Sequence, residues 1–395
     1  MKRLQFLLLL LLALLVFPCA ARADTQTDTP KAGSYSFEDA VKSLDLSSLE
    51  EYKHKVDQEL GQAADNRSLN QWFTDFIKGS WKFDIKQTGS YLSGFFLREI
   101  LANSSLLGKL LLLSVLAALL VNLQTSFSTG IAKISYWACY LALAAMALAS
   151  FRVVLEIGQQ TIDTMAGFMT AMLPQMLVLT AGLGNVNASV MLFPILMTAA
   201  TAFAGVIKNI VFPLIIMSAI LSIVNHLSDS LKVEKMGKLF SQAAQLTMGL
   251  TLTLFVGVLT LRSVYASVLD KVALRTTKFI TDNAIPLVGK MFSDTVEVAA
   301  GYVVMLKQAL GIFGVVVVAG IVILPLIKIA AIALIYRISA MLVEPLGDGK
   351  TATILESMST HLFMMLAAVA AVGLMFLIMI AIIAGMSNGF AMLRS

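Results

Sequence analysis

The feature that most constrains this chain is a series of apolar runs, from Leu106 almost to the C-terminus, that are long enough to cross a lipid bilayer. A helix needs about 20 mainly apolar residues to cross the hydrocarbon core. Inside that core the backbone N–H and C=O groups have no water to bond, so a helix satisfies them internally. Only 13% of the residues are charged, against about 25% in soluble domains. The fold class predicted is an all-α, polytopic helical membrane protein.

Eight of the runs are predicted to be clear spans: 106–123, 134–151, 188–207, 209–227, 246–265, 302–324, 326–343 and 362–384. Two further stretches, 162–184 and 276–298, are harder to assign, because each carries a central proline, Pro174 or Pro286. The second stretch is also polar.

The first 23 residues are typical of a cleavable signal peptide. Lys2 and Arg3 supply the charged start, residues 4–17 form a short apolar run, and Ala21-Arg22-Ala23 is a small-x-small cleavage signal. Cleavage after Ala23 would place the mature N-terminus outside the cytoplasm. The alternative is an uncleaved membrane anchor.

Residues 24–104 are polar and are predicted to form an extracytoplasmic segment with amphipathic helices. The first of these helices follows Ser48 and Glu51, which match a capping box. Its apolar face, and two aromatic stripes after it, suit either the membrane interface or a small helical core. These three sets are Leu49, Tyr52, Val56 and Leu60; Leu69, Trp72, Phe73, Phe76 and Ile77; and Leu92, Phe95, Phe96 and Ile100.

Two pairs of prolines indicate an internal repeat. Pro174 and Pro286 are 112 residues apart, and so are the Pro-Leu-Ile sequences that begin at Pro213 and Pro325. Similar elements follow in the same order in both copies. The predicted organisation is therefore a signal peptide at 1–23, the segment 24–104, a first hairpin at 105–155, repeat 1 at 156–265 and repeat 2 at 266–395.

The two proline-centred stretches decide how the copies are related. If both stretches cross the membrane, each copy has four crossings and the copies are parallel. If both are re-entrant, each copy has three crossings and the copies are inverted. Cytoplasmic loops carry an excess of Lys and Arg, and counting these residues slightly favours the re-entrant arrangement.

Several classes of function find no support in the sequence. Cys139 is the only cysteine outside the signal peptide, and the three histidines, His54, His226 and His361, are far apart, so no metal site or cofactor is expected. No basic run with interleaved aromatics points to nucleic acid. No nucleotide-binding or hydrolase motif occurs, so the chain is not expected to be an enzyme.

The two proline-centred segments, around Pro174 and Pro286, are predicted to meet near the middle of the membrane domain and to form its functional centre. Broken segments would expose helix ends, whose partial charges suit polar ligands. The alternative is a purely structural role, in which Pro286 and Gly289 shape a cytoplasmic loop. Arg337, inside a predicted span, would face a partner or a wet cavity, unless it caps a helix end at the interface. The candidate residues are Pro174, Asp282, Asn283, Pro286, Gly289, Asp294 and Arg337.

Two stretches of sequence carry a resemblance to a known family. One is Arg98-Glu99-Ile100-Leu101-Ala102-Asn103, which runs into Leu106-Leu107-Gly108-Lys109-Leu110. The other, which follows Thr277-Lys278-Phe279-Ile280-Thr281, is Ile285-Pro286-Leu287-Val288-Gly289-Lys290-Met291-Phe292-Ser293-Asp294. With the signal and the length, they resemble the stage III sporulation protein AE family of endospore-forming bacteria.

The resemblance implies a role rather than a reaction. Members of that family sit in the mother-cell membrane facing the forespore. They work with the other proteins of their operon, including an ATPase, and with the forespore protein Q. Together these form a transenvelope channel or feeding apparatus that supports late forespore gene expression. The architecture alone leaves open two other functions, a stand-alone secondary transporter and a membrane scaffold.

Overall fold

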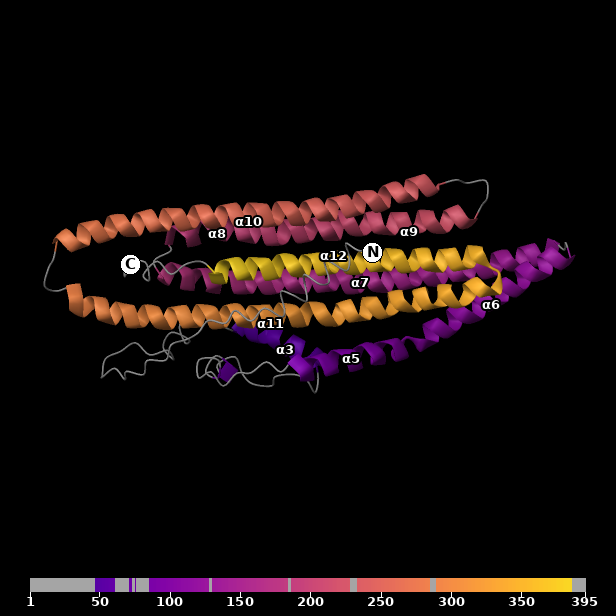
Figure 1. Cartoon of the computed structure of the whole chain (residues 1–395), viewed down its shortest axis with the longest axis horizontal. Helices are drawn as coiled ribbons and strands as arrows, with labels where there is room; N and C mark the ends of the chain where they lie inside the picture. The colour runs from indigo at the N-terminus through magenta and orange to yellow at the C-terminus, as the bar shows by residue number, and fades with distance from the viewer. Residues whose placement is uncertain are drawn as a thin grey trace.

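The computed structural model describes residues 47–60, 71–72, 75, 85–127, 130–183, 186–227, 233–284 and 289–385. These residues form helices and no strand. The long helices lie side by side along one axis and make an elongated bundle (Figure 1). The predicted all-α class is confirmed. The predicted signal peptide at 1–23 lies outside the described residues.

The bundle is built from long helices, preceded by two shorter ones. In chain order they are α3 (Ser47–Leu60), α5 (Ile85–Ala102), α6 (Ser104–Phe127), α7 (Gly130–Gly182), α8 (Val186–Val206), the π-helical turn η2 (Ile207–Val211), α9 (Phe212–Leu227), α10 (Glu234–Ala284), α11 (Gly289–Val343), the 3-10 turn η3 (Glu344–Leu346) and α12 (Gly349–Gly385).

Six helical stretches of the described chain are long and apolar enough to cross a membrane. They are Ser104–Asn122, Ile134–Gly182, Ser189–Asn225, Glu234–Leu261, Gly301–Leu346 and Gly349–Gly385. The chain is therefore a multi-pass membrane protein by the length and composition of its helices.

The prediction of eight separate spans is wrong, because neighbouring runs join into single helices. The predicted spans 302–324 and 326–343 both belong to α11, and the predicted span 134–151 continues in α7 through residues 162–182 of the stretch that was harder to assign. The runs 188–207 and 209–227 are continuous through η2.

Proline does not divide these helices. Pro174 lies inside α7 and Pro325 lies inside α11. A proline removes one backbone donor and crowds the preceding turn, but packed membrane helices tolerate it because neighbours and local adjustments satisfy the freed groups. The prediction that the Pro174 segment could be re-entrant is therefore wrong. The centre of the second segment, residues 285–288, lies outside the described residues.

The joined helices are longer than a bilayer is thick. The 53 residues of α7 span about 80 Å at 1.5 Å per residue, whereas the hydrocarbon core is about 30 Å thick. A single continuous helix can pass through the core only once. Each long helix therefore offers one crossing, and part of the bundle must extend beyond the hydrocarbon.

Contacts along the bundle fix the direction of each helix. The Tyr140 hydroxyl of α7 donates to the Ile223 carbonyl of α9, and further along α7 Asp163 pairs with Lys208. The partner number falls as the α7 number rises, so α8 and α9 run antiparallel to α7. Tyr336 of α11 bonds Ser150 of α7, and α11 is likewise antiparallel to α7 (Figure 1).

Helix α10, which ends predicted repeat 1, and helix α12, which ends predicted repeat 2, run in the same direction. Ser218 of α9 meets Gly237 of α10 and His361 of α12, and both helices run antiparallel to α9. Corresponding elements of the two copies are thus parallel, rather than inverted as the charge count favoured. The duplication itself stays a prediction.

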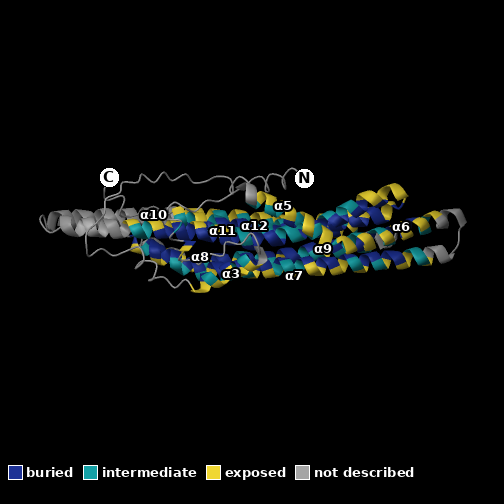
Figure 2. Ribbon diagram, turned by 90° about the horizontal axis from the view of Figure 1, so that it is seen from below, coloured by how far each residue is buried: buried dark blue, intermediate teal, exposed yellow. Residues whose placement is uncertain are grey.

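Close packing of α12 against α7, α9 and α11 forms the core. Residues of α12 are mostly buried, whereas α6 and α10 expose rows of leucines (Figure 2). Glycines allow the close approach: a Cβ at Gly373 of α12 would lie 3.0 Å from both methyl groups of Val322 of α11. Packing at this distance gains dispersion contacts that a looser bundle would lose.

The N-terminal segment packs onto this bundle. In α3, Leu49 is fully buried, and the Tyr52 ring makes an edge contact with Phe168 of α7 at a centroid distance of 5.6 Å. Trp72 packs in the same way on Phe313 of α11, at 5.5 Å. The predicted apolar face of this helix therefore covers the bundle instead of forming a separate small core.

The turn between α11 and α12 follows local rules. Gly347 has φ 90°, a left-handed conformation that glycine adopts without a steric penalty. Asp348 then caps α12: its carboxylate accepts from the Thr351 backbone N–H at 3.1 Å and from the Thr351 hydroxyl. These residues start α12 antiparallel to α11.

Gly158 of α7 provides a test of the core. A Cβ there would lie 2.9 Å from Cζ of Phe212 and 3.2 Å from Cγ2 of Val369, and both side chains are buried. We expect Gly158→Leu to lower the free energy of unfolding by about 1–3 kcal/mol through overpacking. The measurement is the midpoint of thermal unfolding in detergent. Gly249→Leu is the control, because nothing lies within 4 Å of its Cβ position. Equal effects of the two substitutions would contradict this packing.

Candidate functional site

Polar side chains lie at two levels of this apolar bundle. At the first level, one face of α7 carries exposed polar residues in the middle of its 49-residue apolar stretch. They recur every three or four residues and so share one side of the helix. We call them the α7 polar stripe: Arg152, Glu156, Gln160 and Asp163.

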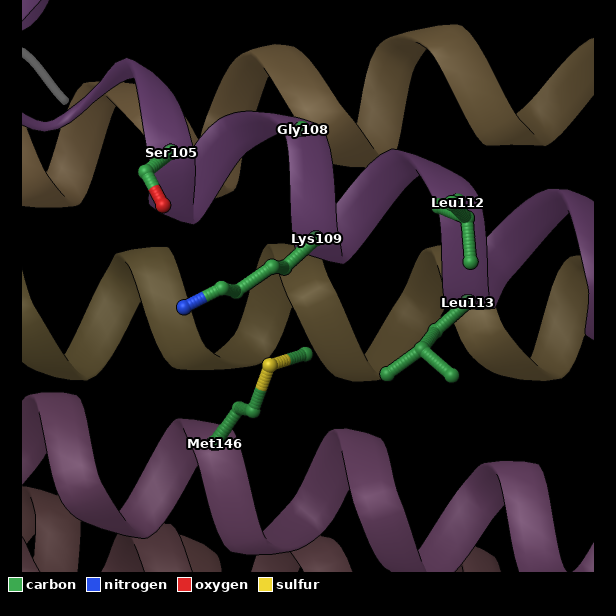
Figure 3. Close-up of a pocket in the computed structure, with 6 residues that line it drawn as sticks. All are labelled: Ser105, Gly108, Lys109, Leu112, Leu113 and Met146. Atoms are coloured by element: carbon green, nitrogen blue, oxygen red, sulfur yellow. The ribbon is translucent and has the colours of Figure 1, made fainter.

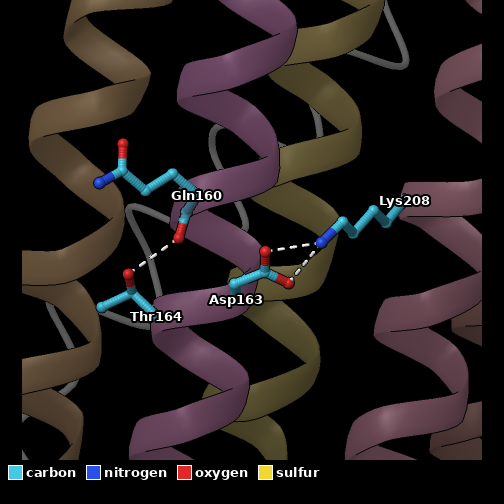
Figure 4. Close-up of polar contacts among 4 residues, drawn as sticks. All are labelled: Gln160, Asp163, Thr164 and Lys208. Carbon is cyan, nitrogen blue, oxygen red and sulfur yellow. Dashed lines mark hydrogen bonds and ion pairs between the residues drawn. The ribbon is translucent and has the colours of Figure 1, made fainter.

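An ion pair joins the stripe to the next helix. Nζ of Lys208 lies 2.8 Å from Oδ1 and 2.6 Å from Oδ2 of Asp163 (Figure 4). The Thr164 hydroxyl donates to the Gln160 carbonyl on the adjoining turn of α7. The Lys208 and Asp163 side chains are 30% and 60% exposed, so the pair lies open on one side of the bundle.

The lysine stands on the π-helical turn, whose origin is in the sequence. Pro213 has no N–H to donate to the carbonyl four residues before it. The preceding Phe212 N–H instead bonds the Ile207 carbonyl, five residues back. Such π turns occur often at functional sites. The local backbone thus places Lys208 opposite Asp163 without breaking the helix.

The second level is a buried cluster where α9, α10 and α12 meet. Nε2 of His361 lies 2.8 Å from Oγ of Ser218, and that hydroxyl lies 2.8 Å from the Gly237 carbonyl. Nδ1 of His361 lies 2.7 Å from the Ser357 carbonyl. His361 and Ser218 are 7% and 2% exposed, and the Phe151 ring of α7 packs edge-on against the imidazole. Three helices are therefore joined through one imidazole and one hydroxyl.

An ion pair flanks this cluster on the outside. Nη1 of Arg337 in α11 lies 2.7 Å from Oε1 of Glu356 in α12. The two side chains are 39% and 54% exposed. One residue further along α12, the Ser357 hydroxyl lies 2.6 Å from that of Ser222 in α9. The polar groups therefore extend from the buried imidazole to the surface of the bundle.

Comparisons with known proteins identify the family. The sequence profile described as stage III sporulation protein AE matches residues 67–387. The chain is also 32% identical over 400 residues to the stage III sporulation protein AE of Bacillus subtilis (strain 168), and the match covers 100% of both chains.

The chain belongs to the stage III sporulation protein AE family.

The family assignment confirms the resemblance drawn from residues 98–110 and 277–294. No solved structure matches the chain. The residue-level description of this member of the stage III sporulation protein AE family therefore comes from its own geometry.

The structure places two of the predicted site residues far apart. Pro174 is half-buried inside α7, near the end of that helix. Arg337 follows Tyr336, whose hydroxyl lies 3.2 Å from the Met146 carbonyl of α7. Met146 and Pro174 are 28 residues apart on one helix, or about 42 Å. Pro174 and Arg337 therefore cannot share one site. Arg337 lies within helix α11, bonded to a carboxylate, and does not cap a helix end.

The other predicted site residues flank the connection between α10 and α11. Asp282 and Asn283 lie in the last turn of α10, while Gly289 starts α11 and Asp294 follows in its second turn. Their side chains, and Pro286 altogether, lie outside the described residues. The predicted approach of this segment to Pro174 stays a prediction.

Sequence reasoning missed Asp163, Lys208, Ser218 and His361. Lys208 falls between the predicted spans 188–207 and 209–227, where a charge was read as the end of a span. His361 lies one residue before the predicted span 362–384. Continuous helices and long-range packing bring Lys208 to Asp163 on the exposed side of α7, and bury Ser218 with His361. The sequence did offer one signal for Asp163. Polar residues recur every three or four positions through 152–163, so they share one face of a helix inside an otherwise apolar stretch.

A shallow recess lies beside the start of α6. It measures about 450 Å³ and is lined by Ser105, Gly108, Lys109, Leu112, Leu113 and Met146 (Figure 3). One cation and one hydroxyl do not make a catalytic arrangement. Among the described residues, no group of three or more His, Cys, Asp or Glu could hold a metal ion.

The pair of Arg337 and Glu356 can be tested by exchanging its charges. Arg337→Glu would place two carboxylates together, and we expect it to lower the free energy of unfolding by about 0.2–1 kcal/mol, the range for exposed pairs. The double variant with Glu356→Arg should recover most of that loss. Thermal unfolding of the single and double variants in detergent measures the coupling. Additive losses in the double variant would show that the two side chains do not interact.

Proposed function

We propose that this chain is the polytopic membrane component of a transenvelope channel or feeding complex between mother cell and forespore. In this role it is needed for late forespore gene expression. Its membership of a sporulation family and its six apolar helical stretches support the proposal. The function is structural or conductive rather than enzymatic.

The α7 polar stripe is the observation that carries this proposal. Charged and polar side chains at membrane depth normally face a protein partner or a wet cavity, because exposure to lipid costs about 2.5–3.5 kcal/mol per charge on insertion scales. Arg152, Glu156 and Asp163 are all exposed in this single chain. A chain that works inside a complex would cover such a stripe with a partner or water.

The proposed partners are the other proteins of the stage III sporulation operon, including its ATPase, and the forespore protein Q. The proposed site is the mother-cell membrane that faces the forespore. Cleavage of the signal peptide at 1–23 would leave the segment 24–104 outside the cytoplasm, on the side of the forespore. In this arrangement α3 and Trp72 brace α7 and α11 on the forespore side.

Two alternative functions are less well supported. A stand-alone secondary transporter was suggested by the internal repeat and the broken segments, but Pro174 lies in a continuous helix. A scaffold that recruits partners through 24–104 would leave the apolar face of that segment free. Leu49 and Trp72 are instead buried on the bundle.

Co-purification from sporulating cells tests the proposal. We expect the tagged full-length protein to bring down the operon proteins and the protein Q in stoichiometric amounts, as identified by mass spectrometry. Arg152→Leu with Glu156→Leu should reduce this recovery at unchanged protein level. Leu141→Ala with Leu148→Ala, on the exposed apolar face of the same helix, is the control. Transport by the purified chain alone in liposomes would instead establish the transporter.

The connection between α10 and α11 is proposed as a second functional element. Asp294→Ala and Gly289→Leu should abolish forespore development while protein level and partner recovery stay normal. Spore counts and late forespore reporter expression measure the effect. The proposed role of this connection would be wrong if both variants sporulate normally, or if sporulation is lost only because the variant protein is degraded.

A further inference from the structure

The cluster around His361 has a proton deficit when the imidazole is neutral. The Ser357 carbonyl can only accept, so at 2.7 Å it requires a proton on Nδ1 of His361. The Ser357 hydroxyl is 3.5 Å from the same nitrogen, too long for a competing hydrogen bond. A neutral ring protonated on Nδ1 leaves Nε2 as an acceptor.

Ser218 then cannot serve both of its neighbours. Its hydroxyl has one proton but lies 2.8 Å from two acceptors, Nε2 of His361 and the carbonyl of Gly237. If the hydroxyl donates to Nε2, its bond to Gly237 is lost. If it donates to Gly237, two lone pairs face each other at 2.8 Å.

A proton on Nε2 resolves this conflict. The Nε2–H then donates to Oγ of Ser218, and the Ser218 hydroxyl donates to the Gly237 carbonyl. Nδ1–H continues to donate to Ser357. No bond other than N–H forms or breaks, and the hydroxyl only rotates. Every hydrogen bond of the cluster is satisfied in this state alone.

We propose that His361 is a proton-binding site that controls the hydrogen bond between α9 and α10. This inference goes beyond the proposed channel role and does not depend on it. The junction is suited to such control because α9 and α10 approach closely: a Cβ at Gly237 would lie 3.6 Å from Cβ of Leu221 and 3.7 Å from the Ser218 carbonyl. One hydrogen bond gained or lost there acts on two helices in direct contact.

The surroundings of the imidazole make the bound proton depend on these bonds. The charges on the helices packed around it lie towards the surface: Arg152 on α7, the Glu234–Lys238 pair and Lys235 on α10, Arg337 on α11 and Glu356 on α12. Helix α9 contributes Ser218 and Ser222, and contains no Asp, Glu, Lys or Arg. No carboxylate is within hydrogen-bond distance of His361 in the described chain, so the hydroxyl of Ser218 is the group that accepts from the protonated Nε2.

Histidine NMR on the full chain tests the proposal. The variant with His54→Gln and His226→Gln keeps His361 as its only histidine. Labelled with ¹⁵N in the ring and held in nanodiscs, it should show the Nδ1–H tautomer near neutral pH. On titration from about pH 8 to pH 4 the ring should become doubly protonated.

Two serine variants in this background separate the proposal from simple burial. Ser218→Ala removes the acceptor of the Nε2–H, and should lower the proton affinity of His361 about tenfold or more, since a hydrogen bond to a charged group is lost. Ser359→Ala is the matched control. Ser359 is buried on α12, the helix of His361, but donates to the Ala333 carbonyl of α11. This substitution should leave the titration unchanged.

Three results would overturn the proposal. The first is an Nε2–H tautomer at neutral pH. The second is a ring that stays neutral until the bundle unfolds. The third is the same titration midpoint in the wild-type cluster and in Ser218→Ala, which would show that Ser218 does not hold the protonated state.

Discussion

Backbone hydrogen bonding inside long apolar helices is the constraint on which this structure depends. In lipid, each unpaired N–H or C=O group costs several kcal/mol, so the chain gains by continuing a helix wherever its side chains allow. Prolines at 174, 194 and 325 remain inside helices for this reason, and Pro213 changes only one turn to a π turn. Because the helices are continuous they are long, and the bundle is longer than the hydrocarbon core is thick.

Continuity of the helices also decides where polar groups meet. Because α7 continues from the predicted span 134–151 through residue 163, its polar residues 152–163 form one stripe at mid-length instead of a loop. Because α8 and α9 are continuous, Lys208 faces Asp163 from the π turn. Close packing of α12 then buries His361 against α9 and α10. An unpaired polar group is costly there because water is excluded.

These two polar levels suit a protein that works with partners. The exposed α7 polar stripe provides a surface for another chain or for water. The buried cluster joins three helices and can bind a proton. The family is known for its place in sporulation, and the family profile covers residues 67–387, which include both levels. A membrane component of a larger complex would use the first for assembly and the second for control of its own packing.

The sequence by itself determined the all-α membrane class, the family and the apolar faces of the helices. Tyr52 and Trp72 were assigned to such faces from spacing alone, and the structure packs both against aromatic rings of the bundle. Spacing works here because the helical period is local. Local signals could not show that 134–151 and 162–184 form one helix, because a proline and a few charges look the same at a span end and in a helix interior. Only the tertiary structure decided that Lys208 pairs with Asp163 and that Ser218 meets His361, 143 residues away. Such pairs depend on the direction and register of packed helices, which the whole bundle sets at once.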